Sequence, residues 1–168
     1  MRRRKITRIL WILIIVVGNI GCDQVSKDMV RDKIEYNANI QIIDDFITLT
    51  KVENTGAFLS LGSEMPRIGY QIIMIFFPLI ILILVLYFLL KSSSQSKLSS
   101  VAISLLVGGG FGNLIDRILY GSVTDFLHFD FGLFQTGIVN MADISITIGF
   151  ILMVLEIYLK KRAVKITT

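Results

Sequence analysis

The chain alternates between long apolar stretches and short charged ones. Four stretches are almost free of ionisable residues, and they cover residues 9–22, 68–90, 98–115 and 131–155. A helix rises about 1.5 Å per residue, so it needs about 20 residues to cross about 30 Å of hydrocarbon. The second stretch has that length, and the third and fourth nearly so. This pattern predicts an integral membrane protein, mainly α-helical, with four transmembrane helices.

The first stretch, with 14 residues, is short for a membrane span. It crosses a bilayer only if its helix begins near Ile6 and continues past Asp23, which brings that carboxylate to the membrane surface or just inside it. Residues 24–36 are charged and compatible with a short outer helix. Asp23 and Lys27 are spaced i, i+4 and can pair. Their simplest interpretation is a solvated helix end.

Composition excludes a water-soluble globule. Hydrophobic residues make up 54% of the 168 residues and the mean hydropathy is +0.71, against about 45–50% hydrophobic residues in soluble domains. One cysteine, Cys22, and one histidine, His128, exclude an internal disulfide and leave no Cys/His cluster for zinc. We therefore expect no metal or other cofactor, and chemistry carried by carboxylates, amides and hydroxyls.

The basic residues predict the orientation. Eleven of the 17 lie before the first span, between the second and third, or after the fourth. Residues 23–68, between the first two spans, instead hold eight acidic and five basic residues. Because cytoplasmic loops are rich in Lys and Arg, both termini are expected in the cytoplasm and the longer loops outside. The net charge of +4 is thereby explained without a nucleic-acid partner.

The segment after the first span predicts a small sheet on the outer membrane surface. Residues 46–52 are rich in β-branched and aromatic types, and Asn54-Thr55-Gly56 is typical of a turn before a second strand at 57–61. Residues 37–62 are therefore expected to be β-rich. In the second span, Pro78 predicts a kink.

Ionisable groups at membrane depth mark function or a paired structural contact, because each costs at least about 2.5–3.5 kcal/mol to insert. The third span ends in Asn113, Asp116 and Arg117, and the fourth begins with Asn140 and Asp143, with Asp125 between them. The third helix runs outward and the fourth runs back, so the three aspartates are expected at one height. Two of them can form a pair. Asn140, Asp143 and Thr147 are expected to share a face that points into the bundle.

Two carboxylates a few ångströms apart in a low dielectric cannot both ionise, so one keeps a proton and the other acts as a base. That is the machinery of an aspartic protease. Structural roles remain open for each residue. Asp116 can form a buried ion pair or helix-end contact beside Arg117, Asp125 can cap a loop, and Asp143 can complement a helix dipole.

Other polar residues have simpler expectations. Asp130 and His128 are expected to be solvated in the outer loop, and Glu156 to pair with Lys160.

Two other functions fit parts of the pattern. A small proton-coupled transporter would use intramembrane carboxylates as a relay, which requires acidic groups across the bilayer. A secreted lipoprotein would use residues 1–21 as a signal peptide and carry lipid on Cys22, since Asn19-Ile20-Gly21 precedes that cysteine. Three further apolar spans fit the second alternative badly.

Five blocks of residues resemble one known family. They are Asp23-Gln24-Val25-Ser26-Lys27, Glu53-Asn54-Thr55-Gly56-Ala57, Gly112-Asn113-Leu114-Ile115-Asp116-Arg117, Val123-Thr124-Asp125-Phe126 and Asn140-Met141-Ala142-Asp143. In this order, and with four spans, they are similar to the bacterial lipoprotein signal peptidases, signal peptidase II. Thr124 departs from the pattern, since many relatives have Val there.

The resemblance implies an aspartic endopeptidase of the bacterial plasma membrane. It would cleave the signal peptide from diacylglyceryl-modified prolipoproteins just before the lipidated cysteine, at the outer face. Asp125 and Asp143 would form the catalytic pair, which decides against Asp116. Residues that would support the site or bind substrate are Asp23, Lys27, Asn54, Gly56, Asn113, Asp116, Arg117 and Asn140.

The same resemblance implies the organisation and partners. Residues 1–168 would form one four-helix domain, with 37–62 as an outward-facing substrate cradle and a mobile outer helix at 24–36. Membrane lipid and cyclic peptide inhibitors such as globomycin are expected partners, and a monomer is expected.

Overall fold

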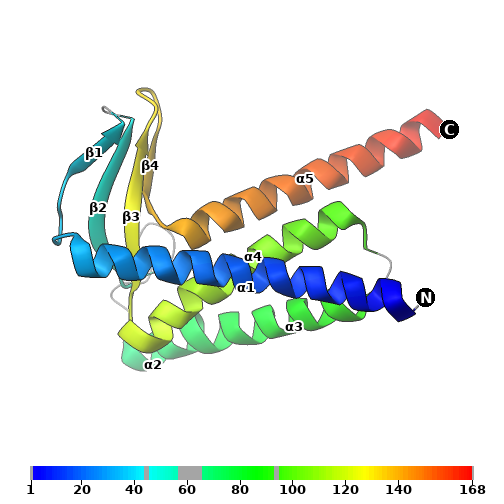
Figure 1. Cartoon of the computed structure of the whole chain (residues 1–168), viewed down its shortest axis with the longest axis horizontal. Coiled ribbons are helices and arrows are strands. Elements are labelled where there is room, and N and C mark those ends of the chain that lie inside the picture. The colour runs from blue at the N-terminus through cyan, green and yellow to red at the C-terminus, as the bar shows by residue number, and fades with distance from the viewer. Residues whose placement is uncertain (1, 44–45, 57–65, 93–94, 168) are drawn as a thin grey trace.

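The computed structural model describes residues 2–43, 46–56, 66–92 and 95–167. Long helices lie side by side in a bundle, and a four-stranded sheet stands at one end of it (Figure 1). Both chain termini lie at the opposite end. We call these the sheet end and the terminal end of the bundle. Four helical segments are long and apolar enough to cross a membrane, as expected.

The first span is one continuous helix, α1 (Arg2–Lys33). The expected outer helix at 24–36 is therefore not a separate element, since α1 itself continues to Lys33. Asp23 and Lys27 were expected to mark a solvated helix end, but α1 runs through both of them. Both are fully buried and paired with each other, so they continue the packed face of α1.

The second span contains the irregularity that Pro78 predicts, slightly earlier in the chain. A short helix α2 (Arg67–Tyr70) passes into the π-helical segment η2 (Gln71–Phe76) and then into α3 (Phe77–Lys91), with Pro78 in the first turn of α3. Proline lacks an N–H and clashes with the preceding turn, so a wider π-helical turn before it relieves the clash.

The third helix, α4 (Lys97–Tyr120), packs against α1, α3 and α5 (Met141–Thr167). Ser96 caps its start and Gly121, with φ of 74°, ends it. Glycines on α4 permit close helix approach. A Cβ at Gly109 would lie 2.5 Å from the Ala142 carbonyl oxygen of α5, and one at Gly112 would lie 2.5 Å from the Asp23 carboxylate of α1.

The sheet is antiparallel, in the order β1-β2-β3-β4. Its strands are β1 (Ile40–Ile43), β2 (Ile47–Asn54), β3 (Val123–Asp130) and β4 (Gln135–Val139). β2 confirms the strand expected at 46–52, whereas the strand expected at 57–61 lies outside the described residues. The other half of the sheet comes from the segment between α4 and α5. His128 and Asp130, expected in a solvated loop, lie in β3 instead.

The sheet is amphipathic across all four strands. The paired residues Ile40, Leu49, Leu127 and Val139 form one row across it, and Gln41, Thr48, His128 and Ile138 form the next. Because neighbouring residues of a strand point to opposite faces, the first row gives an apolar face and the second a mainly polar one. Asp125 lies two residues before Leu127 in β3, on the apolar face.

Candidate active site

Asp125 and Asp143 are joined through a single residue, Asn140, which lies between β4 and α5. The Asn140 side chain donates from Nδ2 to Asp125 Oδ1 (2.6 Å), and its backbone N–H donates to Asp143 Oδ2 (3.2 Å). The Asp143 backbone N–H donates back to Asn140 Oδ1 (3.0 Å). This is a reciprocal cap of the α5 N-terminus, three residues apart, and it fixes the Asp143 carboxylate beside the start of its helix.

Two more amides complete the surroundings of the pair. Asn54 at the end of β2 donates from Nδ2 to Asp125 Oδ2 (3.1 Å). Asn113 of α4 donates from Nδ2 to Asp143 Oδ1 (2.8 Å). Each of the four carboxylate oxygens therefore accepts one N–H group from an asparagine of β2, of α4 or of the position just before α5.

Asp125 is the more buried member of the pair. Only 3% of it is exposed, whereas Asp143 is partly buried. Burial, and then the nearby negative charge of Asp143, raise the pKa of Asp125 to about 6, although the N–H groups of Asn54 and Asn140 oppose the shift. The charge of Asp143 therefore acts directly on Asp125.

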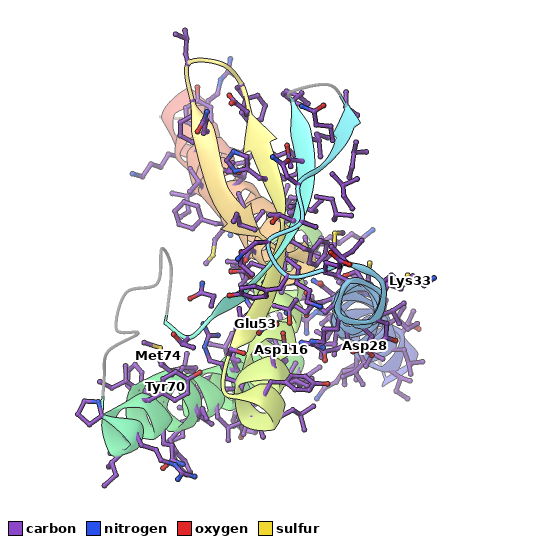
Figure 2. All side chains as sticks on the ribbon, turned by 90° about the vertical axis from the view of Figure 1, so that its left-hand side faces the viewer. Asp28, Lys33, Glu53, Tyr70, Met74 and Asp116 are labelled. Carbon is purple, nitrogen blue, oxygen red and sulfur yellow. The ribbon has the colours of Figure 1, made fainter. Side chains whose placement is uncertain are left out.

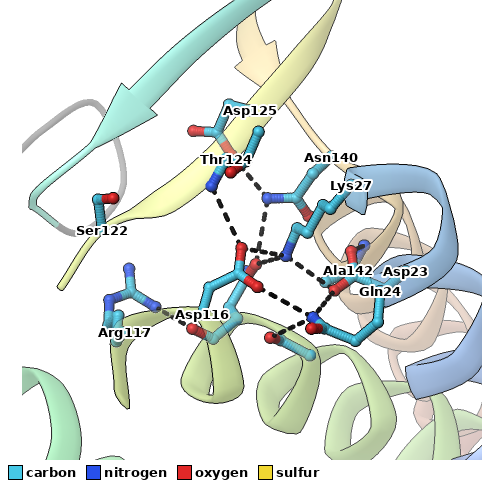
Figure 3. A network of polar contacts seen from close by, with 12 residues as sticks. Asp23, Gln24, Lys27, Asp116, Arg117, Ser122, Thr124, Asp125, Asn140 and Ala142 are labelled. Carbon is cyan, nitrogen blue, oxygen red and sulfur yellow. Dashed lines mark hydrogen bonds and ion pairs between the residues drawn. The ribbon is translucent and has the colours of Figure 1, made fainter. Parts of the chain in front are cut away.

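A buried cluster of charges lies beneath Asp125 (Figure 3). Lys27 Nζ contacts Asp23 Oδ2 at 2.7 Å and Asp116 Oδ2 at 3.2 Å. Arg31 Nη2 contacts the same Asp116 oxygen at 2.8 Å. Asp23, Lys27 and Asp116 are fully buried. Gln24 ties the cluster together by donating to both Asp23 and Asp116. Opposite charges in contact make such burial tolerable, and the cluster locks α1 onto α4.

The cluster also reaches the strands and α5 that carry the pair. Asp23 Oδ1 accepts from the Ala142 backbone N–H (2.9 Å), directly before Asp143. Asp116 Oδ2 accepts from the Thr124 backbone N–H (3.2 Å), directly before Asp125. Two carboxylates of the cluster therefore hold the backbone next to each member of the pair.

Arg117 has a different place from its neighbour Asp116. Its Nη2 donates to the Gly56 carbonyl (2.9 Å), and the Gly56 N–H donates to Asn54 Oδ1 (3.0 Å), which confirms the predicted turn. Among the described residues, Arg117 Nε is buried without a hydrogen-bond partner. Viewed from the sheet end, Asp116 and Glu53 lie between α1, near Asp28 and Lys33, and α2, near Tyr70 (Figure 2).

Several expectations from the sequence are corrected here. Asp116 does form a buried ion pair, but with Lys27 and Arg31 rather than at Arg117. Thr147 does not share the buried face of Asn140, because it is exposed. Glu156 does pair with Lys160, at 2.6 Å, and it also accepts hydrogen bonds from Ser96 and Ser99 of α4.

Residues that sequence reasoning did not single out also shape the site. Arg31 donates from Nε to Thr124 Oγ1 (2.9 Å), and Thr124 donates to Glu53 (2.8 Å). The spacing of Asp23, Lys27 and Arg31, four residues apart each time, is the signal that would have placed Arg31 on the same helix face. Within the described residues, no group of three His, Cys, Asp or Glu side chains could hold a metal ion.

The fold and the site together define a membrane-embedded protein with a buried carboxylate pair at one end of its helix bundle. The signal peptidase (SPase) II family matches residues 13–159. A lipoprotein signal peptidase of Tolumonas auensis is 35% identical over 161 residues, which cover 95% of this chain and 96% of the relative. One from Clostridium acetobutylicum is 33% identical over 151 residues, which cover 89% and 94%.

Solved structures agree with the sequence relatives. A bacterial membrane enzyme solved by the in meso method at 2.3 Å resolution has a TM-score of 0.80 and 31% identity, over 89% of this chain and 88% of that one. Another, at 1.9 Å, has a TM-score of 0.75 and 33% identity, over 87% and 91%. The chain belongs to the signal peptidase II family.

Proposed function

We propose that this protein is an aspartic endopeptidase that removes the signal peptide from diacylglyceryl-modified prolipoproteins, cutting just before the lipidated cysteine. The observation that carries the proposal is the carboxylate pair, Asp125 and Asp143, bridged by Asn140 at the sheet end of the bundle. Family membership supports prolipoproteins as the substrate class.

The chemistry follows from one proton shared by the two acids. Asp125, with its raised pKa, holds the proton, and the Asp143 carboxylate is the base. Asp143 accepts a proton from water while the water oxygen attacks the scissile carbonyl carbon, and Asp125 donates its proton to the carbonyl oxygen. Asp143 then gives its proton to the amide nitrogen while Asp125 takes a proton from a hydroxyl group of the tetrahedral intermediate, so the C–N bond breaks, the carboxyl group forms and the amine leaves.

The surrounding residues divide into three groups. Asn54, Asn113 and Asn140 hold the two carboxylates. Asp23, Lys27 and Asp116 fix the helices and the backbone beside the pair. Gly56 and Arg117 bind the substrate backbone in this proposal, since Arg117 Nη2 donates to the Gly56 carbonyl and Gly56 is bonded to Asn54, which contacts Asp125.

The sheet and the bundle suit a substrate of which one part lies in the bilayer and another part in water. Residues 37–62 act as a cradle, of which β1 and β2 are described, within a single domain that spans residues 1–168. The signal peptide and the lipid tails lie in the bilayer beside the helices. The sheet end faces outward from the bacterial plasma membrane and both termini are cytoplasmic. The protein acts as a monomer, and cyclic peptides such as globomycin compete for the site.

Cleavage by the purified protein tests this function. A lipidated precursor peptide is incubated with the parent protein, with Asp125→Asn and with Asp143→Asn. The parent is expected to cut once, before the lipidated cysteine. Each variant should be folded but slower by about 10²–10⁴-fold, the range for loss of a general acid or base.

The matched control is Asp130→Asn, the same substitution on the same strand, β3. Asp130 contacts only the hairpin residues Gly132 and Gln135 among its side-chain hydrogen bonds described here, so its variant should cut at the parental rate. Parental cleavage by Asp125→Asn or Asp143→Asn would contradict the assignment.

The two alternatives make different predictions. A transporter would move protons in reconstituted vesicles, and its relay would need acids along the bundle, but Glu156 at the terminal end is held by Lys160, Ser96 and Ser99. A secreted lipoprotein would lose residues 1–21, which an intact-mass measurement detects. In the structure this segment packs into the bundle, with Ile12 and Val16 buried.

A further inference from the structure

Lys27 makes one contact that the ion cluster does not require. Its ammonium group donates hydrogen bonds to Asp23 Oδ2 at 2.7 Å and to Asn113 Oδ1 at 2.9 Å, and it forms an ion pair with Asp116 Oδ2 at 3.2 Å. The Lys27 side chain is fully buried. The contact with Asn113 leads away from the cluster and toward the carboxylate pair.

Asn113 connects Lys27 to Asp143. Its Oδ1 faces Lys27, and its Nδ2 donates to Asp143 Oδ1 at 2.8 Å. A side-chain amide can also turn over and exchange its oxygen and nitrogen. An ammonium group can only donate, so a reversed Asn113 would place NH₂ against NH₃⁺ and an oxygen against the Asp143 carboxylate. Lys27 therefore selects the orientation that donates to Asp143.

The other partner of Asn113 Oδ1 depends on the same arrangement. Asn140 Nδ2 donates to it at 3.1 Å, and also donates to Asp125. Asn140 is itself oriented by the backbone N–H of Asp143, which its Oδ1 accepts. Within this set, Lys27 is the only charged donor and the only member that comes from α1.

The positive charge of Lys27 is largely offset where it lies. Asp23 and Asp116 face Lys27 and Arg31, two negative and two positive groups in contact. The Lys27 charge still acts on Asp125, whose pKa it lowers, but its contact with Asp143 passes through the hydrogen bonds of Asn113.

We propose that Lys27 is a positioning residue of the carboxylate pair, which holds the Asn113 amide in the orientation that donates to Asp143. The proposal rests on the proposed function of that pair. Lys27 acts through Asn113 and touches neither substrate nor the reacting atoms. It thus joins α1, the first helix of the chain, to the chemistry at the start of the last.

A double-mutant cycle tests the connection. Lys27→Met and Asn113→Leu should each lower kcat by about 100-fold, the scale of a misplaced catalytic group, with KM within about threefold of the parent. If Lys27 acts through Asn113, the double variant loses no more than the worse single variant. Independent effects would instead multiply to about 10⁴-fold.

Three variants distinguish a positioning role of Lys27 from a purely structural one. Arg31→Met removes the other cation on Asp116 but no contact to Asn113, so it should lower the thermal midpoint as Lys27→Met does and lower kcat clearly less than Lys27→Met does. Lys27→Gln restores a neutral N–H donor and should recover part of the kcat lost in Lys27→Met. Lys27→Met alone leaves the buried Asp23 carboxylate without its cation, which can impair folding. The double variant Asp23→Asn/Lys27→Met removes one charge of each sign and avoids this. Its kcat is compared with that of Asp23→Asn alone.

Three results would overturn the proposal. The first is that Lys27→Met leaves kcat unchanged both in the parent protein and in Asp23→Asn. The second is that the kcat losses of Lys27→Met and Asn113→Leu multiply in the double variant. The third is that Arg31→Met lowers kcat as much as Lys27→Met does. The outcome is also distinct from a failure of the proposed function. If Asp143→Asn abolishes cleavage but Lys27→Met does not, only the role of Lys27 is wrong, whereas cleavage by Asp143→Asn removes the function of the pair.

Discussion

Burial and a second carboxylate both act against the charged form of Asp125. Among the causes of its raised pKa, loss of solvation is the largest and the Asp143 charge comes next. Two amide donors act in the opposite direction and keep the value near 6. A carboxyl group poised there can hold a proton in weakly acidic solution and yet release it during a reaction, which suits a general acid.

The first prediction concerns the pH dependence of cleavage. Because the pKa of Asp125 is raised to about 6, its proton is present below that pH and lost above it. We expect kcat/KM, which reports the free protein, to fall as pH rises through about 6. Asn54→Leu removes a donor that stabilises the charged form, so the fall should move to higher pH. A midpoint that stays in place or moves down in this variant would contradict the assignment.

At the same scale, the sequence predicts the identity of the site residues better than their contacts. Asp125, Asp143 and Asn140 follow from depth and family pattern, and the structure brings them together. The burial of Asp23 and Lys27 does not follow, because their partners Asn113 and Asp116 lie more than 80 residues away. A pair spaced i, i+4 has the same local pattern on a solvated helix end and in a packed interface.

Between elements, the closeness of α4 to its neighbours decides the geometry of the site. Gly109 faces the backbone of α5 at Ala142, one residue before Asp143, whereas the adjacent Gly110 faces the end of the Leu82 side chain on α3. The two glycines are adjacent in the sequence, but Gly109 faces a backbone carbonyl and Gly110 faces the end of a flexible side chain. A rigid carbonyl cannot move aside without shifting α5, but a terminal methyl group can rotate.

The second prediction uses this matched pair. Gly109→Ala would place its Cβ 2.5 Å from the Ala142 carbonyl oxygen, so we expect a destabilisation of about 1–3 kcal/mol and reduced cleavage. A Cβ at Gly110 meets only the Leu82 side chain, with Cδ2 nearest at 2.6 Å, and alanine favours helix by about 1 kcal/mol over glycine, so Gly110→Ala should be near neutral. Thermal unfolding in detergent, followed by circular dichroism, measures both. Equal losses would show that the α4–α5 contact is not limiting.

Elements defined by local pattern are those the sequence predicts well. Apolar length identifies all four spans. β4 escapes the same reasoning because residues 131–155 read as one uncharged stretch, although only α5 from Met141 is helical there. β3 escapes it because His128 and Asp130 were expected in a solvated loop. Gly132, with φ of 79°, and the β-branched run of β4 are the local signals of a hairpin. The pairing of β3 with β2 joins segments about 70 residues apart, which no local pattern specifies.

For the molecule as a whole, the two ends of the bundle differ in chemistry. The sheet and the carboxylate pair lie at one end, and both termini lie at the other (Figure 1). Described basic residues at the terminal end include Arg8, Lys91 and Lys160. Because loops rich in Lys and Arg stay in the cytoplasm, this asymmetry of charge favours the proposed orientation, with the pair on the outer side of the membrane.

The third prediction tests this orientation by labelling cysteines in cells. Cys22 is the only cysteine of the chain, so Cys22→Ser gives a background free of thiols. Leu133, fully exposed beyond the end of β3, and Lys161, exposed near the end of α5, mark the two ends of the bundle. In that background a membrane-impermeant maleimide should label Leu133→Cys in intact cells, and Lys161→Cys only after lysis. The reverse pattern would place the carboxylate pair in the cytoplasm, where a signal peptide inserted with its cleavage site outside could not reach it.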